Sequence, residues 1–465
     1  MAGAAPIPTS DAQAGAAPRP GTAPDSQPWP PRRDAYYSLF CMTIVVMFTV
    51  LDRSVMALLI DPIKQDFSIT DTQAALLIGA AFSLPYGIAG IAVARLADFS
   101  NRRNLVAASL AVWSACTVAC GVAQGYVSLL IARMGIGAGE SGYGPASWSI
   151  ATDNWPREKV AFATATMGIG AMLGTGLALF LGGAILHAVS GMPPLALPGI
   201  GVIRPWQWTF ILVGAPGLVW ALVVLTSKEP PRRGLAAGET AKKVPVGDVA
   251  RWLRDDWRTY LATIGGMAMK AMMLAVPVTW GATFLHRQFG WELSRIGMIT
   301  GTITLIVSPV ALMAGAKLSE YWTRQGRKDA NLRIVFYGLI VSIPLMVAAP
   351  LMPSPYLVLA TNALVSFVGT LGFGPSIAAF QVITPNRMRA QVGSLTQFCN
   401  NVIAFALSPI IVALFTDYIF RDPSALRYSM VLNALVMGLL SLAIVWQGLG
   451  PYARSYERAV REFAD

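Results

Sequence analysis

Residues 94–103 of the chain read ARLADFSNRR, a short charged connection between two long apolar runs. A related stretch, KLSEYWTRQGRK, occupies residues 317–328 and again separates two apolar runs. In both stretches a leucine is followed two positions later by an acidic residue and then by arginines. Because a charged motif returns at the same place in two sets of apolar runs, we predict an internal repeat and two similarly built halves.

The apolar runs themselves are long enough to cross a membrane, which takes about 20 residues of α-helix. Hydrophobic residues make up 55% of the 465 residues and charged residues 13%, whereas soluble proteins are about 25% charged. We therefore predict an all-α membrane protein with twelve transmembrane helices in two six-helix halves. The expected spans are 36–60, 70–94, 104–122, 126–150, 159–187 and 207–227, then 260–285, 295–316, 332–352, 356–382, 390–416 and 427–448.

Polar segments divide the chain into five parts. The first 34 residues are rich in Ala, Pro and Gly and lack a basic start before an apolar core, so they predict a disordered tail and not a cleaved signal. The stretch after the sixth run is too polar to span a membrane and predicts a linker. The expected order is a tail (1–34), a first bundle (35–227), a linker (228–258), a second bundle (259–449) and a tail (450–465).

Lysine and arginine are unevenly divided between the two sides of the predicted spans. With the first residue placed inside, six of the 35 basic residues lie outside, three lie within spans, and the rest lie inside. Positively charged loops remain on the cytoplasmic side. We therefore predict a multi-pass protein of the inner or plasma membrane with both termini and the linker in the cytoplasm. The six outer residues are Lys64, Arg204, Arg287, Arg295, Arg421 and Arg427.

The connection at 94–103 resembles the signature of the major facilitator superfamily between its second and third spans. It departs from that signature at Ala94, where the family has glycine, and at Phe99, where the family has a basic residue. Residues 133–141 (RMGIGAGES) and the pair Asp52-Arg53 resemble the spinster-like branch of the family. The resemblance implies secondary active transport by alternating access, and for this branch lysophospholipid or sphingoid-like substrates.

Five ionisable side chains lie well inside predicted spans: Asp52, Arg53, Arg133, Glu140 and Lys270. Each costs about 2.5–3.5 kcal/mol or more at the centre of a lipid-exposed helix, so each needs a partner, water or a function. A carboxylate whose surroundings alternate between dry and wet binds its proton with alternating strength, which couples proton movement to conformation. We therefore expect Asp52 and Glu140 to be proton-coupling sites with Arg53 and Arg133 as charge partners, as the resemblance also implies. A static charge cluster joining spans one and four is the alternative.

Substrate-binding candidates lie in three spans. Lys270 stands alone near the middle of span seven, where it could attract an anionic head, pair with Asp52 or Glu140, or reach a polar backbone group. Tyr143 follows the spinster-like segment of span four and is a further candidate. Three amides at helical spacing in span eleven could line a polar cavity or form hydrogen bonds between helices. They are Gln397, Asn400 and Asn401.

The repeated motif supplies the candidate gating residues. We expect these side chains to cap helix ends and to pair across the inner gate when the carrier faces outward; solvated loop charge is the alternative. The candidates are Asp98, Arg102, Arg103, Glu320 and Arg324.

Enzymatic and ATP-driven functions have little support in the sequence. The two histidines, His187 and His286, are far apart, and there is no phosphate-binding G-x-x-x-x-G-K-[ST] loop. The four cysteines all fall in apolar stretches, so we expect neither a metal nor a cofactor. The short basic clusters do not predict nucleic-acid binding.

The leading hypothesis is a monomeric, proton-coupled carrier of a lysolipid- or sphingoid-like solute, with protons and membrane lipids as its other partners. The alternative is a proton-coupled organic-anion or aromatic-acid symporter that uses Lys270 and Arg53 as anion ligands. A receptor or channel without coupled transport is a third possibility, and the chain has no long soluble signalling domain to support it.

Overall fold

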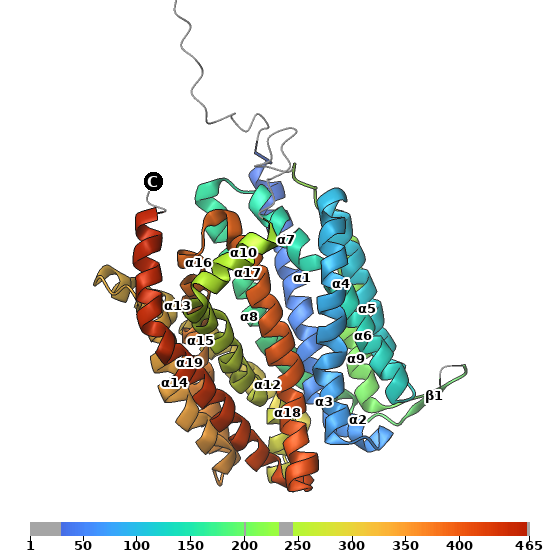
Figure 1. Ribbon diagram of the computed structural model, residues 1–465. Coiled ribbons are helices and arrows are strands. Elements are labelled where there is room, and N and C mark those ends of the chain that lie inside the picture. Colours follow the sequence, from blue (N-terminus) through green and yellow to red (C-terminus); the bar gives the residue numbers. More distant parts are fainter. Residues whose placement is uncertain (1–28, 200, 232–244, 463–465) are drawn as a thin grey trace, which may run out of the picture.

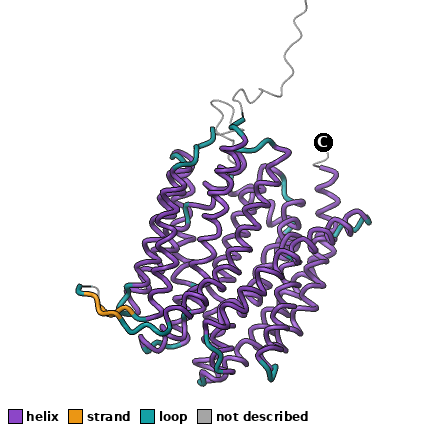
Figure 2. The backbone as a smooth tube through the Cα atoms, turned by 180° about the vertical axis from the view of Figure 1, so that it is seen from behind, coloured by secondary structure: helices purple, strands orange, loops and turns teal. Residues whose placement is uncertain are grey.

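A computed structural model describes residues 29–199, 201–231 and 245–462, which form one bundle of helices (Figure 1). Helix α1 (Arg32–Leu58) begins, and α19 (Leu426–Glu462) ends, at the same end of the bundle, which we call the termini end. The opposite end carries a small hairpin of β1 (Leu195–Leu197) and β2 (Gly201–Ile203), in which Leu195 pairs with Ile203 (Figure 2). We call it the hairpin end. The hairpin was not predicted.

The first half contains nine of the described α-helices. After α1 they are α2 (Ile60–Phe67), α3 (Asp71–Ile78), α4 (Ala80–Phe99), α5 (Arg102–Gly121), α6 (Tyr126–Glu140), α7 (Tyr143–Asp153), α8 (Arg157–Val189) and α9 (Pro205–Leu225).

The second half contains the remaining described helices. Short π-helical segments (η1, η3 and η4) and 3-10 segments (η2 and η5) lie between several of its α-helices. Before α19 they are α10 (Val246–Asp255), α11 (Trp257–Tyr260), π-helix η1 (Leu261–Gly266), α12 (Met267–Phe289), α13 (Leu293–Arg324), α14 (Ala330–Ala348), η2 (Ala349–Leu351), α15 (Pro355–Leu371), α16 (Phe373–Ile383), α17 (Asn386–Cys399), π-helix η3 (Asn400–Leu407), α18 (Ser408–Leu414), π-helix η4 (Phe415–Phe420) and η5 (Pro423–Ala425).

Eleven helical stretches among the described residues are long and apolar enough to cross a membrane. The expected span at 126–150 is the exception, because it is interrupted after Glu140 and divides into α6 and α7. Each piece is shorter than the roughly 20 residues that a continuous span needs. Counted together, α6 and α7 complete the predicted set of twelve.

The segments expected to be polar contain more helix than predicted. The last helix continues past residue 449 to Glu462, so most of the expected C-terminal tail extends the final span. Within the expected linker, α10 packs Val249 into the apolar core of the second half. Helix α1 begins at Arg32, inside the expected N-terminal tail. Residues 1–28 and 232–244 lie outside the described part of the chain.

Each half has its own apolar core, and a third cluster joins the two halves at the hairpin end. That cluster includes Leu58 and Ala75 from the first half with Trp280 and Val412 from the second. Close contact between α8 and α13 adds to it, since a Cβ atom built on Gly183 would lie only 2.8 Å from the amide nitrogen of Met298. Small residues allow such close contact between helix backbones in lipid.

Candidate transport site

The four charged residues predicted for spans one and four meet inside the first half. Asp52 and Arg53 come from α1, and Arg133 and Glu140 from α6. Glu140 is 0%, Arg133 1% and Asp52 3% exposed. The Arg53 guanidinium donates a hydrogen bond to Glu140 Oε1 and forms an ion pair with it. Arg53 and Glu140 therefore have the expected pairing.

Glycine places α6 close enough to its neighbours to bury these charges. A Cβ atom built on Gly139 would lie 3.0 Å from the amide nitrogen of Trp113 on α5, and one on Gly137 would lie 3.0 Å from the carbonyl carbon of Phe82 on α4. Neither contact leaves room for a larger side chain. The glycines of residues 135–139 thus position Glu140 at the end of α6.

Arg133 binds backbone groups in place of a carboxylate. Its Nε donates to the carbonyl oxygen of Leu77 at 3.2 Å, and its Nη1 donates to the backbone carbonyl oxygen of Asp52 at 3.3 Å. Asp52 Oδ1 and Glu140 Oε2 are buried and accept no hydrogen bond from the described residues. A buried acceptor without a donor costs about 1–3 kcal/mol, and more if charged. An added proton at either of these two oxygens would therefore relieve such a penalty.

Two aromatic rings on α4 cover the arginines, and the sequence analysis did not identify them. The Arg53 guanidinium carbon lies 4.3 Å from the ring centroid of Phe82 and 5.5 Å from that of Tyr86. The Arg133 guanidinium carbon lies 5.9 Å from the Phe82 centroid. Cation–π contacts of this kind favour a positive charge away from water. Phe82 and Tyr86 are four residues apart and therefore lie on one helix face. This spacing could have identified them in the sequence as a pair of rings on one side of α4.

Lys270, on α12 in span seven, is 8% exposed. Its side chain packs against span ten at the point where that span is interrupted. Its Nζ is 3.4 Å from the carbonyl oxygen of Gly369, and a Cβ atom on Gly372, between α15 and α16, would lie 2.7 Å from Nζ. The C-terminal end of a helix carries unpaired carbonyls and partial negative charge, which favour a cation. Lys270 thus reaches a polar backbone group, and no ion pair joins it to any carboxylate in the described part of the chain.

The other predicted substrate contacts are dispersed. Tyr143 packs edge-on against Trp113, with ring centroids 5.7 Å apart. Asn400 opens the π-helix of span eleven and has a buried Oδ1 without a hydrogen-bond donor among the described residues. Gln397 is exposed, and the side chain of Asn401 lies outside the described set. Of the two amides whose side chains are described, Asn400 has the stronger need for a polar partner.

The largest charged network at the termini end is centred on Arg102. Its guanidinium pairs with Asp153, pairs with Glu229 at 2.8 Å, and donates to the carbonyl oxygen of Pro230 at 2.7 Å. Glu229 Oε2 accepts the backbone N–H of Arg103 at 2.8 Å. These contacts join the first half to the start of the linker, and the sequence analysis did not predict Asp153 or Glu229 as partners.

The corresponding motif of the second half is solvated. Arg324 pairs with Glu320 one helical turn away, and the Arg324 side chain is 78% exposed. Such exposed pairs contribute little to stability. The side chain of Asp98 falls outside the described residues. The two copies of the repeated motif therefore differ in burial.

A second network joins the two halves at the hairpin end. Arg287 at the end of α12 donates to Asp61 at 2.9 Å and to Asp71 at 2.8 Å, and Lys64 also pairs with Asp71. Asp417 accepts hydrogen bonds from both the backbone N–H and the hydroxyl of Thr72 at 2.7 Å. Together with the shared apolar cluster, this second network joins the two halves and closes the hairpin end.

The sequence analysis counted Lys64 and Arg287 only as loop charges. Asp61 and Asp71, which flank Lys64 in the sequence, could have indicated a charged network at this end.

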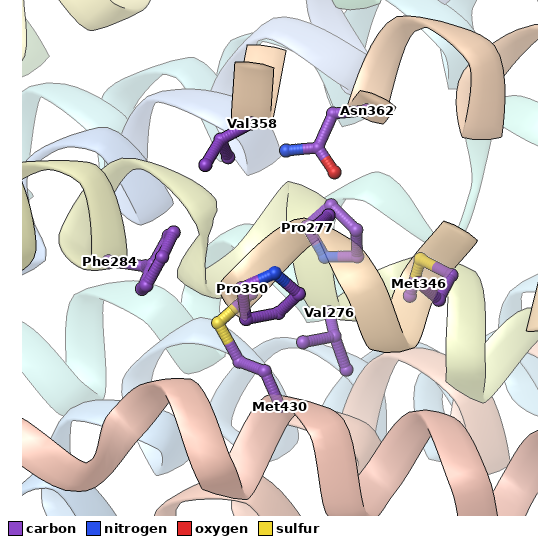
Figure 3. Close-up of a pocket in the computed structure, with 9 residues that line it drawn as sticks. Val276, Pro277, Phe284, Met346, Pro350, Val358, Asn362 and Met430 are labelled. Atoms are coloured by element: carbon purple, nitrogen blue, oxygen red, sulfur yellow. The ribbon is translucent and has the colours of Figure 1, made fainter. Parts of the chain in front are cut away.

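A small hollow in the second half is too small to hold a substrate. Its volume is about 10 Å³, and a single amide, Asn362, lies among apolar side chains that include Phe284 and Met430 (Figure 3). A cavity of this size holds at most about one water molecule. The hollow is not the transport site.

Two six-span halves around buried charges, with one end closed by contacts between the halves, define the class of polytopic membrane transporters. Residues 42–409 match the family model of the Major Facilitator Superfamily, and the chain belongs to this family. The predicted family and its twelve-helix fold are confirmed.

Several relatives and a solved structure are similar over most of the chain. An MFS-type efflux pump of Mycolicibacterium smegmatis is 27% identical over 91% of this chain and 94% of its own length. Protein spinster of Drosophila melanogaster is 21% identical over 84% of this chain, which spans 63% of that protein. The hexuronate transporter of Bacillus subtilis is 27% identical over 63% of this chain and 65% of its own length.

The solved structure is a bacterial homolog of the human lysosomal transporter Spinster in an inward-facing, unoccupied conformation. It superposes with a TM-score of 0.76 at 24% identity, covering 92% of this chain and 99% of the other. The fold likeness agrees with the predicted resemblance to the spinster-like branch.

Proposed function

We propose that this transporter is a proton-coupled secondary carrier that moves an amphipathic, lysolipid-like solute by alternating access. The observation that carries the proposal is the pair of buried carboxylate oxygens, Asp52 Oδ1 and Glu140 Oε2, which lack donors beside the Arg53–Glu140 ion pair. A proton bound to Asp52 removes a buried charge that forms no ion pair among the described residues, and a proton bound to Glu140 removes the negative charge from its ion pair with Arg53. When the cavity becomes wet, the charge is solvated and the proton can leave.

The site explains how proton binding would change the contacts between α1 and α6. A protonated Glu140 holds Arg53 less firmly, because the ion pair becomes a hydrogen bond between a charged guanidinium and an uncharged carboxyl group. Arg53 would then remain over Phe82 and Tyr86, where the rings still favour its charge. The Arg53 side chain is 28% exposed, and its guanidinium would become available to an anionic group of a substrate.

Lys270 supports a substrate with an anionic head. It is a buried cation without an ion pair among the described residues, and a carboxylate or phosphate would supply the missing partner. A lysophospholipid carries such a head on an apolar tail.

The second candidate is a proton-coupled symporter of organic anions or aromatic acids, with Lys270 and Arg53 as anion ligands. It is favoured by the same unpaired Lys270 and by relatives named as transporters of hexuronate and, probably, sulfoacetate. For either substrate, the excess of basic residues at the termini end supports placing both termini and the linker in the cytoplasm. We propose a monomer as the transporting unit.

Transport into proteoliposomes tests the proposal. Purified protein should accumulate a fluorescent lysophosphatidylglycerol when a pH gradient is imposed, and a protonophore should stop the accumulation. Accumulation of benzoate without lysolipid transport would establish the second candidate instead. Accumulation of either substrate that is insensitive to the protonophore and follows a sodium gradient would contradict proton coupling.

A further inference from the structure

A polar cavity at the termini end lies outside the charge cluster used for transport. Its volume is about 320 Å³, and it is formed where the start of span seven meets the end of span twelve. Asp255 to Thr259 line one side, and Pro451, Arg454, Ser455 and Arg458 line the other. Its size matches a phospholipid headgroup better than a single ion.

The cavity contains two arginines that the protein leaves without acidic partners. Arg458 is held by Asp256 through two hydrogen bonds, at 3.0 and 3.2 Å. Arg258 and Arg454 form no ion pair within the described residues, and Asp255 is the one remaining acid of the lining. The charges left uncompensated are thus two positive and one negative, which favours an anion.

The walls of the cavity are held in place by direct contacts. Thr259 and Ser455 join their hydroxyls across it at 3.0 Å, and both residues are buried. The Arg258 guanidinium carbon lies 5.4 Å from a ring centroid of Trp257. The two hydrogen bonds that Arg458 donates to Asp256 join the same two segments of the chain. A ligand would therefore meet a largely preformed site.

The position of the cavity places it at the headgroup level of a membrane. Helix α19 has 37 residues, or about 55 Å at 1.5 Å per residue, whereas the hydrocarbon core is about 30 Å thick. The last turns of the helix, with Arg454 and Arg458, must therefore project beyond the core. Trp257 is 55% exposed and begins the apolar stretch of span seven. Exposed tryptophan at the end of a span is typical of the membrane interface.

We propose that this cavity binds the headgroup of an anionic diacyl phospholipid. The phosphate lies between Arg258 and Arg454, and the acyl chains run along the exposed apolar faces next to Trp257 and Leu261. Basic pockets between transmembrane helices bind such headgroups by the same chemistry. Because the lipid contacts both span seven and span twelve, it stabilises the second half at the place where the linker enters it.

Lipid titration of the purified, full-length protein tests the proposal. We expect dioleoyl phosphatidylglycerol to raise the thermal unfolding temperature and phosphatidylcholine to leave it unchanged, since a ligand that binds the native state stabilises it. The double variant R258Q/R454Q should bind phosphatidylglycerol about tenfold more weakly. The single variant Arg454→Gln, in which an exposed residue changes, should show part of this loss and provides the test if the double variant fails to fold.

Matched controls separate this site from diffuse charge and from the transport site. R251Q/R461Q removes two exposed arginines of the same end outside the cavity and should keep the lipid affinity. Lys270→Gln should also keep it. An equal loss in R251Q/R461Q would show attraction to a general basic surface and would overturn the proposal. Stabilisation of the same size by glycerol phosphate would overturn it too, because the site would then bind a soluble anion.

Discussion

In the first half of the bundle, four ionisable side chains from α1 and α6 meet in the interior, whereas the second half buries one charged side chain among its described residues, Lys270. The apolar scaffold of six spans is present in both halves. In the first half Glu140 is paired with Arg53, whereas in the second half Lys270 lies against the carbonyl end of α15 without an ion pair among the described residues. An unpaired buried charge is costly in a membrane, and the difference accords with the proposal that protons act on the first half and the substrate completes the second.

The largest effect is expected from Asp52→Asn, which removes a buried carboxylate of the first half that forms no ion pair among the described residues. Accumulation driven by a pH gradient should fall to the level without a gradient, while substrate exchange at equal pH continues. Both rates and the expression level should be measured in proteoliposomes, with Glu140→Gln for comparison. Asp34→Asn, near the start of the same helix in a surface ion pair with Lys228, is the matched control. Full accumulation by both Asp52→Asn and Glu140→Gln would refute the proton assignment.

Lys270→Gln tests the second half. Because a charged hydrogen bond contributes about 1.5–3 kcal/mol, loss of the cation should weaken binding of an anionic lysolipid about tenfold or more. Binding of an uncharged monoacylglycerol should change little, and the pH gradient should still drive transport. Lys317→Gln, which alters an exposed lysine, serves as the control. Equal weakening for both ligands would mean that Lys270 supports the break in span ten and not the substrate.

Arg287→Gln tests the network that joins the halves at the hairpin end. The variant removes the bonds of Arg287 to Asp61 and Asp71 and leaves Lys64 as the one cation beside these two carboxylates among the described residues. Because breaking a partly buried ion pair is destabilising, the outward-open state should become about tenfold more populated. A cysteine introduced at Ala75, in an otherwise cysteine-free chain, should then react faster with a membrane-impermeant maleimide. Arg295→Gln, which loses a hydrogen bond to Tyr356 and a contact with the Trp291 ring but no ion pair among the described residues, should not change the rate. If both variants react alike, the network does not hold the gate.

The smallest effects are expected from substitutions in the two copies of the repeated motif. Arg102→Gln should destabilise the protein by about 2 kcal/mol, because it leaves Asp153 and Glu229 without their buried partner. Arg324→Gln should stay within about 0.5 kcal/mol, as expected for a surface residue. Thermal unfolding in detergent measures both. Equal shifts would contradict the difference in burial between the two motifs.

Local pattern in the sequence was sufficient for the scaffold and for the residues of the charge cluster. Long apolar runs must be helices in lipid, because no other structure satisfies their backbone groups within one segment. Charges inside those runs are few and costly, so Asp52, Arg53, Arg133 and Glu140 could be identified one by one. That Arg133 would bind two backbone carbonyls could not be read from spacing, since one acceptor lies on α1 and the other on α3.

Tertiary structure alone decided which charges meet and where spans break. Arg287 lies 226 residues from Asp61 and 216 from Asp71, and Arg102 lies 127 residues from Glu229. Helical periodicity relates residues within a few turns, so it contains no information about such pairs. The sequence by itself determined twelve spans, two halves and a set of buried charges. The packing of helix against helix determined that Arg53 pairs with Glu140, that the buried Lys270 has no acidic partner among the described residues, and that the hairpin end is closed.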